Sequence, residues 1–432
     1  MCGKLRARTN IPHNKTCAGQ ALCRAPGLKL RRRAAGEGNT MTNQQIIERD
    51  NAHVAHTYGR NQIALEQGKG MHVTDFDGKE YLDFTSGIGV NSLGYCDPDW
   101  VAAVSEQAGR LQHTSNLYYT DPCGQLAETL CKRTGFDKVF FANSGAEANE
   151  GSMKAARKYS FDTYGEGRYQ VVSLVNSFHG RTLASLTATG QEVFHHYFGP
   201  FNEGFAYTPA NDYEAFLKTV TPATCAVIME MVQGEGGVCA LDKDYVSKVN
   251  AYCHEHDILI IVDEVQTGIG RTGTFLAYEQ FDVQPDVVSL AKGLGGGLPI
   301  GAVLMSEKVA KGMGPGTHGT TFGGNPVVCA GANVVMKKLT DEMLADVRAK
   351  AAALRAGLAK LPHVQEVSGL GLMVGIAFEE GISAKEVLTA CQNKGLLCLT
   401  AKTRLRLLPP LVLTNEDIEK ALNILNEVLS AL

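Results

Sequence analysis

DVVSLAKGLGGGLP, which spans residues 286–299, is the stretch of sequence that decides the fold. Val287–Leu290 is a short apolar run with Pro285 before it and glycines after it, and this pattern predicts a buried strand. Lys292 follows at the carboxyl end of the strand, where open α/β sheets bind their ligands. Burial there would disfavour the ammonium and leave a nucleophilic amine near neutral pH. The alternative is a surface lysine that happens to follow a strand.

Short apolar runs alternate with helical patterns around this stretch, from about residue 96 to residue 325. This alternation predicts an α/β fold with a mostly parallel sheet. Before it, Gly68–Gly78 reads as a hairpin with an Asp-Gly turn. We therefore expect a large domain over residues 96–330, preceded by an N-terminal segment over residues 43–95.

After residue 330 the pattern changes. An alanine- and lysine-rich helix is expected over Asp341–Lys360 and a glycine-spaced strand over Leu370–Phe378. Ser383-x-x-Glu386 and Thr414-x-x-Asp417 each predict a capping box that opens a helix. These elements predict a smaller C-terminal α/β domain over residues 331–432, against which residues 43–95 would pack.

The composition limits the classes of partner. The 432 residues are 44% hydrophobic and 20% charged, with a formal net charge of -4. This charge gives no electrostatic basis for binding nucleic acid or an anionic membrane. No apolar run approaches the roughly 20 residues that a membrane span needs. The twelve cysteines contain no CxxC pair and no zinc-ligand spacing with histidine, so we expect reduced thiols and no metal site.

The first residues differ from the rest of the chain. Residues 1–36 contain nine Lys or Arg and no acid, because Glu37 is the first acidic residue. An Arg-rich, acid-poor segment without an apolar core is typical of an organelle transit peptide, which we predict over residues 1–42. A disordered basic tail is the alternative. Plastid and mitochondrion cannot be distinguished on physical grounds.

Asp263 follows a second apolar run, Ile258–Val262, which predicts a central strand. A carboxylate in this position needs a cationic partner or hydrogen-bond donors, and a protonated pyridine nitrogen is one such partner. Asp263 and Lys292 each end a strand, so one βαβ step would bring them to adjacent strand tips. A Schiff-base lysine beside an acid of this kind is the arrangement that pyridoxal phosphate uses. A salt-bridged or helix-capping Asp263 is the alternative.

Three further stretches lie at expected strand ends. Residues 143–150, NSGAEANE, open a helix and would offer backbone N–H groups to a phosphate. Phe178 could stack on a flat ring, and Arg181 could bind a substrate carboxylate. Residues 318–326, HGTTFGGNP, form a glycine-rich hydroxyl loop. Each has an ordinary structural explanation alone, but together they indicate one site at the edge of the sheet.

With these motifs in view, the chain resembles the class III pyridoxal-phosphate aminotransferases over roughly residues 50–430. The motifs that carry the resemblance, in the order and spacing of the family, are NSGAEANE, SFHGRT, QGEGGV, DEVQTGIGRTG, AKGLGGGLPIGA, HGTTFGGNP and RLLPPL. Within the class, Val90–Tyr119 is especially similar to the acetylornithine aminotransferases of plants and algae. The resemblance implies the fold type I architecture of pyridoxal-phosphate enzymes, with a large and a small domain.

The resemblance also implies the cofactor contacts. Lys292 would form the Schiff base with pyridoxal phosphate and move the proton, and Asp263 would pair with the ring nitrogen. The other implied contacts are Phe178 and Val265 on the two ring faces, Gln266 at the ring hydroxyl, Gly145 and Ala146 at the phosphate, and Thr321 reaching the phosphate from the other subunit of a homodimer.

The implied substrates are small molecules. Arg181 would bind the α-carboxylate of acetylornithine, and Arg406 that of glutamate or 2-oxoglutarate, with Glu235 covering Arg406 in the other half-reaction. Tyr58 and Thr320 would be neighbours in the substrate pocket. A movable Arg–Glu pair is physically reasonable because an unpaired buried arginine is costly.

The implied reaction is a reversible ping-pong transamination of N-acetylornithine and 2-oxoglutarate in arginine biosynthesis. It gives N-acetylglutamate semialdehyde and glutamate, and the implied location is the chloroplast or, alternatively, the mitochondrion. An ornithine or 4-aminobutyrate aminotransferase is the runner-up, although Ile88 stands where ornithine aminotransferases carry a tyrosine. A decarboxylase has no positive sign in the sequence. A protein that has lost catalysis is disfavoured by the intact Lys292 and Asp263.

Met231 and Tyr95 depart from the residues usual in the family, which are a proline and a histidine. Neither position is among the implied cofactor contacts. The departures therefore bear on local backbone shape and substrate preference.

Overall fold

The structure is a computed structural model that describes residues 41–432, so the transit peptide predicted over residues 1–42 lies outside the described residues except for its last two. A seven-stranded sheet has the strand order β4-β12-β11-β10-β7-β5-β6. In that order its strands are Lys138–Ala142, Gly301–Met305, Val287–Leu290, Leu259–Asp263, Thr224–Met229, Gln170–Leu174 and Phe205–Thr208.

The seven-stranded sheet is mostly parallel, as the sequence predicts. The exception is β12, which pairs antiparallel with both β11 and β4. Its direction follows from chain length, because only residues 291–300 separate β11 from β12, fewer than a parallel crossover needs. β10 and β11 are adjacent and parallel, and Asp263 lies opposite Ser289. The link between them contains only the short η3 (Ala277–Gln280) instead of an α-helix.

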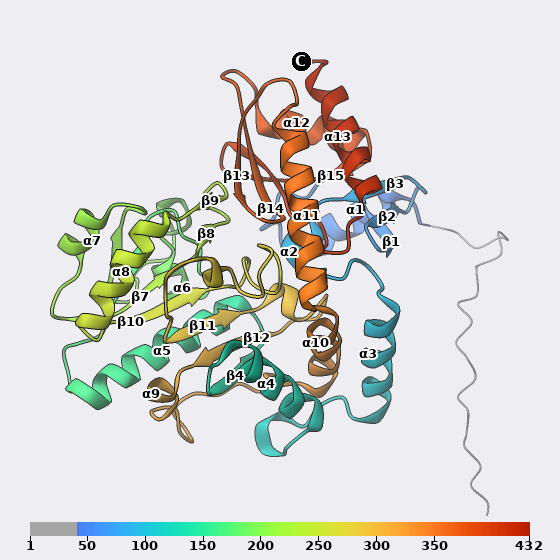
Figure 1. Cartoon of the computed structure of the whole chain (residues 1–432). Helices are drawn as coiled ribbons and strands as arrows, with labels where there is room; N and C mark the ends of the chain where they lie inside the picture. Colours follow the sequence, from blue (N-terminus) through green and yellow to red (C-terminus); the bar gives the residue numbers. More distant parts are fainter. Residues whose placement is uncertain (1–40) are drawn as a thin grey trace, which may run out of the picture. The chain divides into compact units, whose positions relative to one another are not determined.

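Both faces of this sheet are covered, which explains why its strands are continuously apolar. Leu259 and Ile261 of β10 pack into a cluster with Met153 and Ala156 of α5 (Gly145–Tyr164). The alternate residue Ile260 belongs to the larger core on the other face. In Figure 1, α5 runs along the strands of this sheet. The chain therefore positions the start of α5 beside the carboxyl ends of β10 and β11.

A four-stranded antiparallel sheet, in the order β13-β14-β17-β16, is formed by the C-terminal part of the chain. Its strands are Val364–Leu370, Met373–Phe378, Arg404–Leu407 and Leu399–Ala401. The N-terminal strands β1 (Leu65–Lys69), β2 (His72–Asp75) and β3 (Glu80–Asp83) join the C-terminal region through β15 (Leu396–Leu397), which pairs parallel with β3. Figure 1 accordingly shows β1–β3 in blue beside the orange and red C-terminal elements.

The remaining elements connect and cover these sheets. They are α1 (Asn43–His53), α2 (Ser86–Gly89), α3 (Pro98–Arg110), η1 (Ser115–Leu117), α4 (Asp121–Thr134), α6 (Leu183–Ala188), η2 (Glu192–Phe194), α7 (Tyr213–Thr219), β8 (Val232–Gln233), β9 (Cys239–Ala240), α8 (Lys243–Glu255), η4 (Lys292–Leu294), α9 (Glu307–Ala310), α10 (Pro326–Lys338), α11 (Asp341–Leu358), α12 (Ala384–Asn393) and α13 (Asn415–Leu429).

The local predictions are confirmed in part. The strand expected over Leu370–Phe378 is present as β14 but begins at Met373, because Leu370 ends β13 and Gly371 turns the chain at a φ of 55°. Ser383 precedes α12 without a side-chain capping hydrogen bond. The Asp-Gly turn does connect β2 to β3, and Thr414 forms the expected capping box at α13.

Within residues 41–432, no helix is long and apolar enough to cross a membrane. The cysteines described there are free thiols. No group of three or more His, Cys, Asp or Glu residues in this part of the chain is placed to hold a metal ion.

Candidate active site

A cavity of about 470 Å³ opens at the carboxyl ends of β10 and β11. Its lining includes eight of the residues singled out in the sequence, namely Gly145, Ala146, Phe178, Arg181, Asp263, Val265, Gln266 and Lys292. Ligands of open α/β sheets bind at this edge. The structure therefore brings most of the predicted cofactor contacts together.

Asp263 is a buried and hydrogen-bonded acid in the cavity. It is 3% exposed, and its carboxylate accepts three hydrogen bonds. His179 Nδ1 lies 2.8 Å from Oδ2, Asn149 Nδ2 lies 2.6 Å from the same oxygen, and the backbone N–H of Val265 lies 2.9 Å from Oδ1. Hydrogen bonds to the charged form compensate for burial of a carboxylate. Asp263 can thus present a negative charge to a cation in the cavity.

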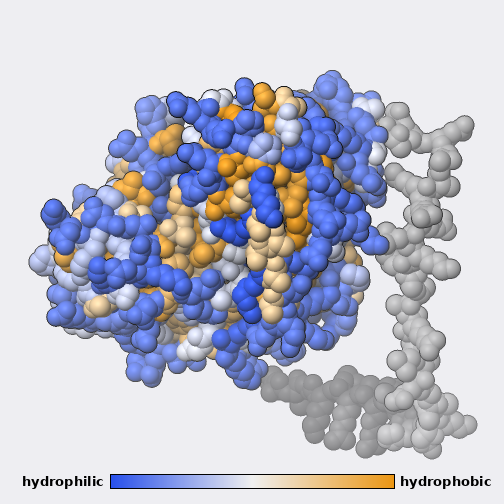
Figure 2. Space-filling model, turned by 45° about the horizontal axis from the view of Figure 1, so that its top comes forward, coloured by the Kyte–Doolittle hydropathy of each residue, from blue (hydrophilic) through white to orange (hydrophobic). Residues whose placement is uncertain are grey.

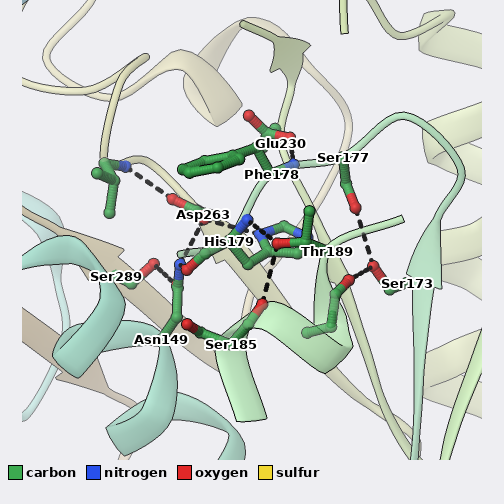
Figure 3. A network of polar contacts seen from close by, with 12 residues as sticks. Asn149, Ser173, Ser177, Phe178, His179, Ser185, Thr189, Glu230, Asp263 and Ser289 are labelled. Atoms are coloured by element: carbon green, nitrogen blue, oxygen red, sulfur yellow. Dashed lines mark hydrogen bonds and ion pairs between the residues drawn. The ribbon is translucent and has the colours of Figure 1, made fainter. Parts of the chain in front are cut away.

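The donors to Asp263 are themselves fixed by a network of polar contacts (Figure 3). Asn149 Oδ1 accepts a 2.6 Å hydrogen bond from Ser289 Oγ on β11, and Asn149 Nδ2 also donates to the carbonyl of His179 at 2.8 Å. The backbone N–H of His179 donates to Thr189 Oγ1 at 2.9 Å. Sequence reasoning assigned no role to Asn149, His179 and Ser289, although all three lie within motifs that it identified.

Lys292 lies at the start of η4, directly after β11. Its φ of 44° falls in the left-handed region, which an L-residue adopts only at a cost. Such strain is concentrated at functional sites. Burial lowers the pKa of Lys292, and Arg406 adds to the effect, while the acids Glu235, Asp263 and Glu230 oppose it when they are ionised. The cavity therefore favours a free amine at this position.

The N-terminus of α5 forms the anion-binding end of the cavity. Gly145 and Ala146 are its first residues, and the Ser144 side chain caps the helix by accepting from the N–H of Glu147 at 3.2 Å. The first N–H groups of a helix have no partner inside the helix and attract anions. A Cβ at Gly145 would lie 2.6 Å from Cγ1 of Val265, so only glycine permits this close approach.

Two arginines approach the cavity in different ways. Arg181 is exposed and lies over the rings of Phe178 and Phe194, with the guanidinium carbon 5.5 Å and 4.0 Å from the ring centroids. Arg406, on β17, is buried, and its Nη1 forms a 2.6 Å ion pair with Glu235 Oε1. Burial alone would raise the pKa of Glu235, but the charge and hydrogen bond of Arg406, together with Lys292 and Gln266, lower it overall.

Among the predicted contacts, five are not lining residues of the cavity, namely Arg406, Glu235, Thr320 and Tyr58 for the substrate and Thr321 for the cofactor phosphate. Thr320 is partly buried and is held at the edge, where its Oγ1 accepts from Asn143 Nδ2 at 2.9 Å. Thr321 is exposed, and Tyr58 is 73% exposed. Neither residue lines the cavity of this chain. Their predicted roles involve the substrate or a second subunit, so these roles stay predictions.

The residues around the cavity fit pyridoxal phosphate. The amine of Lys292 suits its aldehyde, and the carboxylate of Asp263 suits its protonated ring nitrogen. The N-terminus of α5 suits its phosphate. A cavity with these groups, on a mostly parallel sheet beside a smaller C-terminal sheet, defines a pyridoxal-phosphate-dependent aminotransferase of fold type I.

The chain belongs to the family described as Aminotransferase class-III, whose model matches residues 53–429. It is 55% identical over 391 residues to an acetylornithine aminotransferase of Haemophilus ducreyi, covering 90% of this chain and 100% of the relative. It is 46% identical over 390 residues to the acetylornithine aminotransferase of Caldanaerobacter subterraneus, covering 89% and 99% of the two chains.

Solved structures of the same class are similar in fold. The N-acetylornithine aminotransferase from Stenotrophomonas maltophilia has a TM-score of 0.77 at 36% identity, covering 89% of this chain and 98% of the other. The ornithine aminotransferase from Toxoplasma gondii has a TM-score of 0.86 at 32% identity, covering 91% and 96%. The predicted class, fold and cofactor are therefore confirmed.

Proposed function

We propose that the protein is an N-acetylornithine:2-oxoglutarate aminotransferase that serves arginine biosynthesis. One observation carries this proposal. A buried arginine, Arg406, is covered by Glu235 at 2.6 Å beside the cavity that contains Lys292, while Arg181 stays exposed at the same cavity. One arginine is therefore always available for a carboxylate, and the second becomes available only when Glu235 moves.

This arrangement suits two substrates that take turns in one site. 2-Oxoglutarate and glutamate carry two carboxylates, which two arginines can bind as bidentate partners. Acetylornithine carries one carboxylate and a neutral amide, so the second arginine should then be neutralised. The pair of Arg406 and Glu235 supplies that neutralisation, because an unpaired buried guanidinium would be costly.

The side chains around Lys292 support the chemistry of the amino transfer. Bound pyridoxal phosphate supplies an electron sink for the carbon that loses its proton. Lys292, with its pKa lowered by burial, can take up and return that proton. Asp263 holds a negative charge in a fixed place through its three hydrogen bonds. Val265 and Phe178 both line the cavity that contains these groups.

The alternative substrate is free ornithine or 4-aminobutyrate. The fold similarity to the Toxoplasma gondii ornithine aminotransferase keeps this alternative open. Against ornithine stands Ile88, an apolar residue that is 44% exposed in the short α2, where Ser86, Gly87 and Ile88 all have positive φ. A β-branched residue in that region is strained, as is common at substrate-binding loops. An apolar residue there offers no hydrogen bond to a second charged amine.

The homodimer with active sites at the interface is part of the same proposal. Leu117, Tyr118, Tyr119 and Phe322 are exposed large hydrophobic side chains. Thr321, adjacent to Phe322, is also exposed. Figure 2 shows hydrophobic surface gathered toward the middle of one face instead of being spread evenly. Clustered exposed apolar residues mark association surfaces. Sedimentation of the purified protein and loss of phosphate affinity in Thr321→Ala would test this.

The location proposed for the enzyme is the chloroplast, with the mitochondrion as the alternative. The basic, acid-free sequence of residues 1–36 supports an organelle transit peptide. Residues 1–45 fused to a fluorescent protein should carry it into an organelle. A cytosolic or nuclear signal would contradict the proposal.

The substrate is tested by steady-state assays of the mature, cofactor-loaded protein with 2-oxoglutarate as acceptor. We expect acetylornithine to have a kcat/KM at least about 10-fold above that of ornithine and of 4-aminobutyrate, the size of effect expected from a few pocket contacts. A preference for ornithine would reassign the substrate but leave the reaction class unchanged.

A further inference from the structure

Glu230 is a second acid at the carboxyl edge of the sheet, beside Asp263. It directly follows β7, the parallel neighbour of β10, and Met229 pairs with Val262. Glu230 and Asp263 are therefore the next residues on adjacent strands. Glu230 is 6% exposed and lines the same cavity as Lys292.

The two acids differ in their hydrogen-bond donors. Asp263 accepts from three donors, as described above. Glu230 accepts from one, the backbone N–H of Phe178, which lies 3.0 Å from Oε2 (Figure 3). Within residues 41–432, Glu230 takes part in no ion pair. A buried carboxylate with one neutral donor is poorly compensated, whereas a carboxylic acid there is not.

The charges that face Glu230 come from several elements. Asp263 on β10 and Glu235 after β8 are acids that oppose a further negative charge, and Lys292 on η4 favours one. Arg406 on β17 is already paired with Glu235. The other titratable groups of the cavity lining are His179, which is hydrogen-bonded to Asp263, and the exposed Arg181. Burial and then the Asp263 charge raise the pKa of Glu230 well above its usual range.

We propose that Glu230 is held as a neutral carboxylic acid, and that its lack of charge keeps Lys292 available as a free amine. The proposal rests on the proposed function, in which the Lys292 amine takes up and returns a proton. Glu230 is in this account a positioning residue that acts through Lys292. Two neighbouring carboxyls with opposite protonation states are a recurring way to assign separate roles in one site.

The physical reason is that a charge near Lys292 shifts the pKa of its amine strongly. At an effective dielectric constant of about 20, one full charge at roughly 6 Å shifts a pKa by roughly two units. An ionised Glu230 would therefore stabilise the ammonium of Lys292 and oppose the effect of burial. A neutral Glu230 leaves that effect intact.

The test titrates Lys292 in three Glu→Gln variants of the full chain. In cofactor-free protein, the rate of labelling of Lys292 by an amine-reactive reagent is followed against pH. In Glu230→Gln the pH midpoint of Lys292 labelling should stay within about half a pH unit of the wild-type value, because one neutral group replaces another. In Glu235→Gln it should fall by about one unit or more, because an ionised acid facing Lys292 is lost.

Glu264→Gln is the matched control. Glu264 is equally buried and adjacent to Asp263 in sequence, but it does not line the cavity. It should leave the Lys292 midpoint unchanged. Burial raises the pKa of Glu264 to about 7, so at a pH of about 8.5 it is mostly ionised. Infrared spectra at that pH should then show a carboxylic-acid band that Glu230→Gln removes and Glu264→Gln keeps.

Two outcomes would overturn the proposal. One is a fall of about one unit or more in the Lys292 midpoint of Glu230→Gln, since Glu230 would then be an ionised partner. The other is no loss of the carboxylic-acid band in that variant. If Glu230→Gln does not fold, Glu230→Met serves for the same titration, because it is also uncharged and of similar size. None of these measurements uses a substrate, so a wrong amino donor in the proposed function would not alter them.

Discussion

The floor of the cavity and its arginine-bearing rim are built in opposite ways. The floor carries Asp263, which ends β10, and Lys292, which begins η4 two residues after the end of β11, so their positions follow from two adjacent parallel strands of one sheet. The rim carries Arg181, which is exposed, and Arg406, which comes from a different sheet. The contact between Arg406 and Glu235 joins residues that are 171 positions apart in the sequence.

This difference in construction matches a difference in function. The acid Asp263 must stay in place during the reaction cycle, whereas the carboxylate bound by Arg406 must change. The carboxylate of Asp263 has three donors, of which Asn149 is held by Ser289 and His179 by Thr189 through its backbone N–H, and this favours one arrangement. Arg406, by contrast, makes its short contact through Nη1, while its buried Nε has no hydrogen-bond partner in the described part of the chain. A guanidinium with an unused donor can exchange one carboxylate for another.

Lys292→Ala should have the largest effect. Transamination should fall by at least about 10⁴-fold, because the variant has no amine to bind the cofactor or move the proton. Borohydride reduction followed by peptide mapping should find the cofactor attached to Lys292 in the wild type and to no lysine in the variant. Cofactor attached to another lysine would show that Lys292 is not the residue that binds it.

Asp263→Asn should lower kcat by about 10²- to 10³-fold, the scale of a preorganised electrostatic contact. The amide is nearly the same size, but its NH₂ group would face the donors His179 and Asn149 or displace the N–H of Val265. Stopped-flow kinetics and the cofactor dissociation constant should both change. Asn149→Ala removes one of the three donors and should show a smaller loss. Near-normal turnover of Asp263→Asn would show that the fixed charge is not needed.

These two residues were predictable from the sequence because the floor depends on local signals. Each follows an apolar run, and strand ends of a parallel sheet meet at one edge. The pairing of β10 with β11 could be anticipated from that rule alone. The reversed direction of β12 was not anticipated, although the short link before it contains the reason.

The parts that could not be predicted depend on contacts between distant segments. His179, Asn149 and Ser289 come from three different elements, and no spacing in the sequence shows that they meet at Asp263. The same holds for the contact of Arg406 with Glu235, which the family resemblance supplied and the residues alone did not. Gly371 was read as part of a strand because its positive φ is visible only in the structure.

The rim should respond to substitution unequally in the two half-reactions. Arg406→Ala should weaken the step with 2-oxoglutarate by about 30- to 1000-fold, the value of one bidentate carboxylate contact. It should affect the step with acetylornithine less, because Glu235 covers Arg406 there. Single-turnover absorbance measurements with each substrate separate the two steps.

Arg181→Ala is the counterpart and should severely weaken the step with acetylornithine. It could weaken the step with 2-oxoglutarate as well, since that substrate has a second carboxylate. Equal losses in both steps for Arg406→Ala would mean that Arg406 maintains the fold or serves both substrates alike. The hypothesis that Arg406 exchanges the carboxylate of Glu235 for that of a substrate would then be wrong.

Glu264→Gln should have the smallest effect on catalysis, because Glu264 follows Asp263 but does not line the cavity. The side chain of Glu264 points away from the cavity lining and accepts from Thr267 Oγ1 at 2.5 Å and from the N–H of Tyr278 at 2.8 Å. Glutamine can satisfy both partners, since its oxygen accepts from the N–H and its NH₂ can donate to the hydroxyl. We expect kcat within about threefold of the wild type, as for a conservative change outside a site.

The same variant should nevertheless change how stability depends on pH. Burial raises the pKa of Glu264 from 4.5 to about 7 in the folded protein. Between those values the folded state keeps a proton that the unfolded state has lost, so the free energy of unfolding falls as pH rises through this window. The free energy of unfolding therefore falls by about 3 kcal/mol across this window, and the loss is constant above it.

Glutamine does not titrate. Relative to the wild type, Glu264→Gln should therefore gain about 3 kcal/mol between pH 4.5 and pH 8, measured by urea unfolding of the cofactor-free protein. Glu255→Gln, on the exposed end of α8, should show no such gain. An identical pH dependence for Glu264→Gln and the wild type would mean that Glu264 is already ionised in the fold, and that the region behind the floor tolerates charge as readily as the rim.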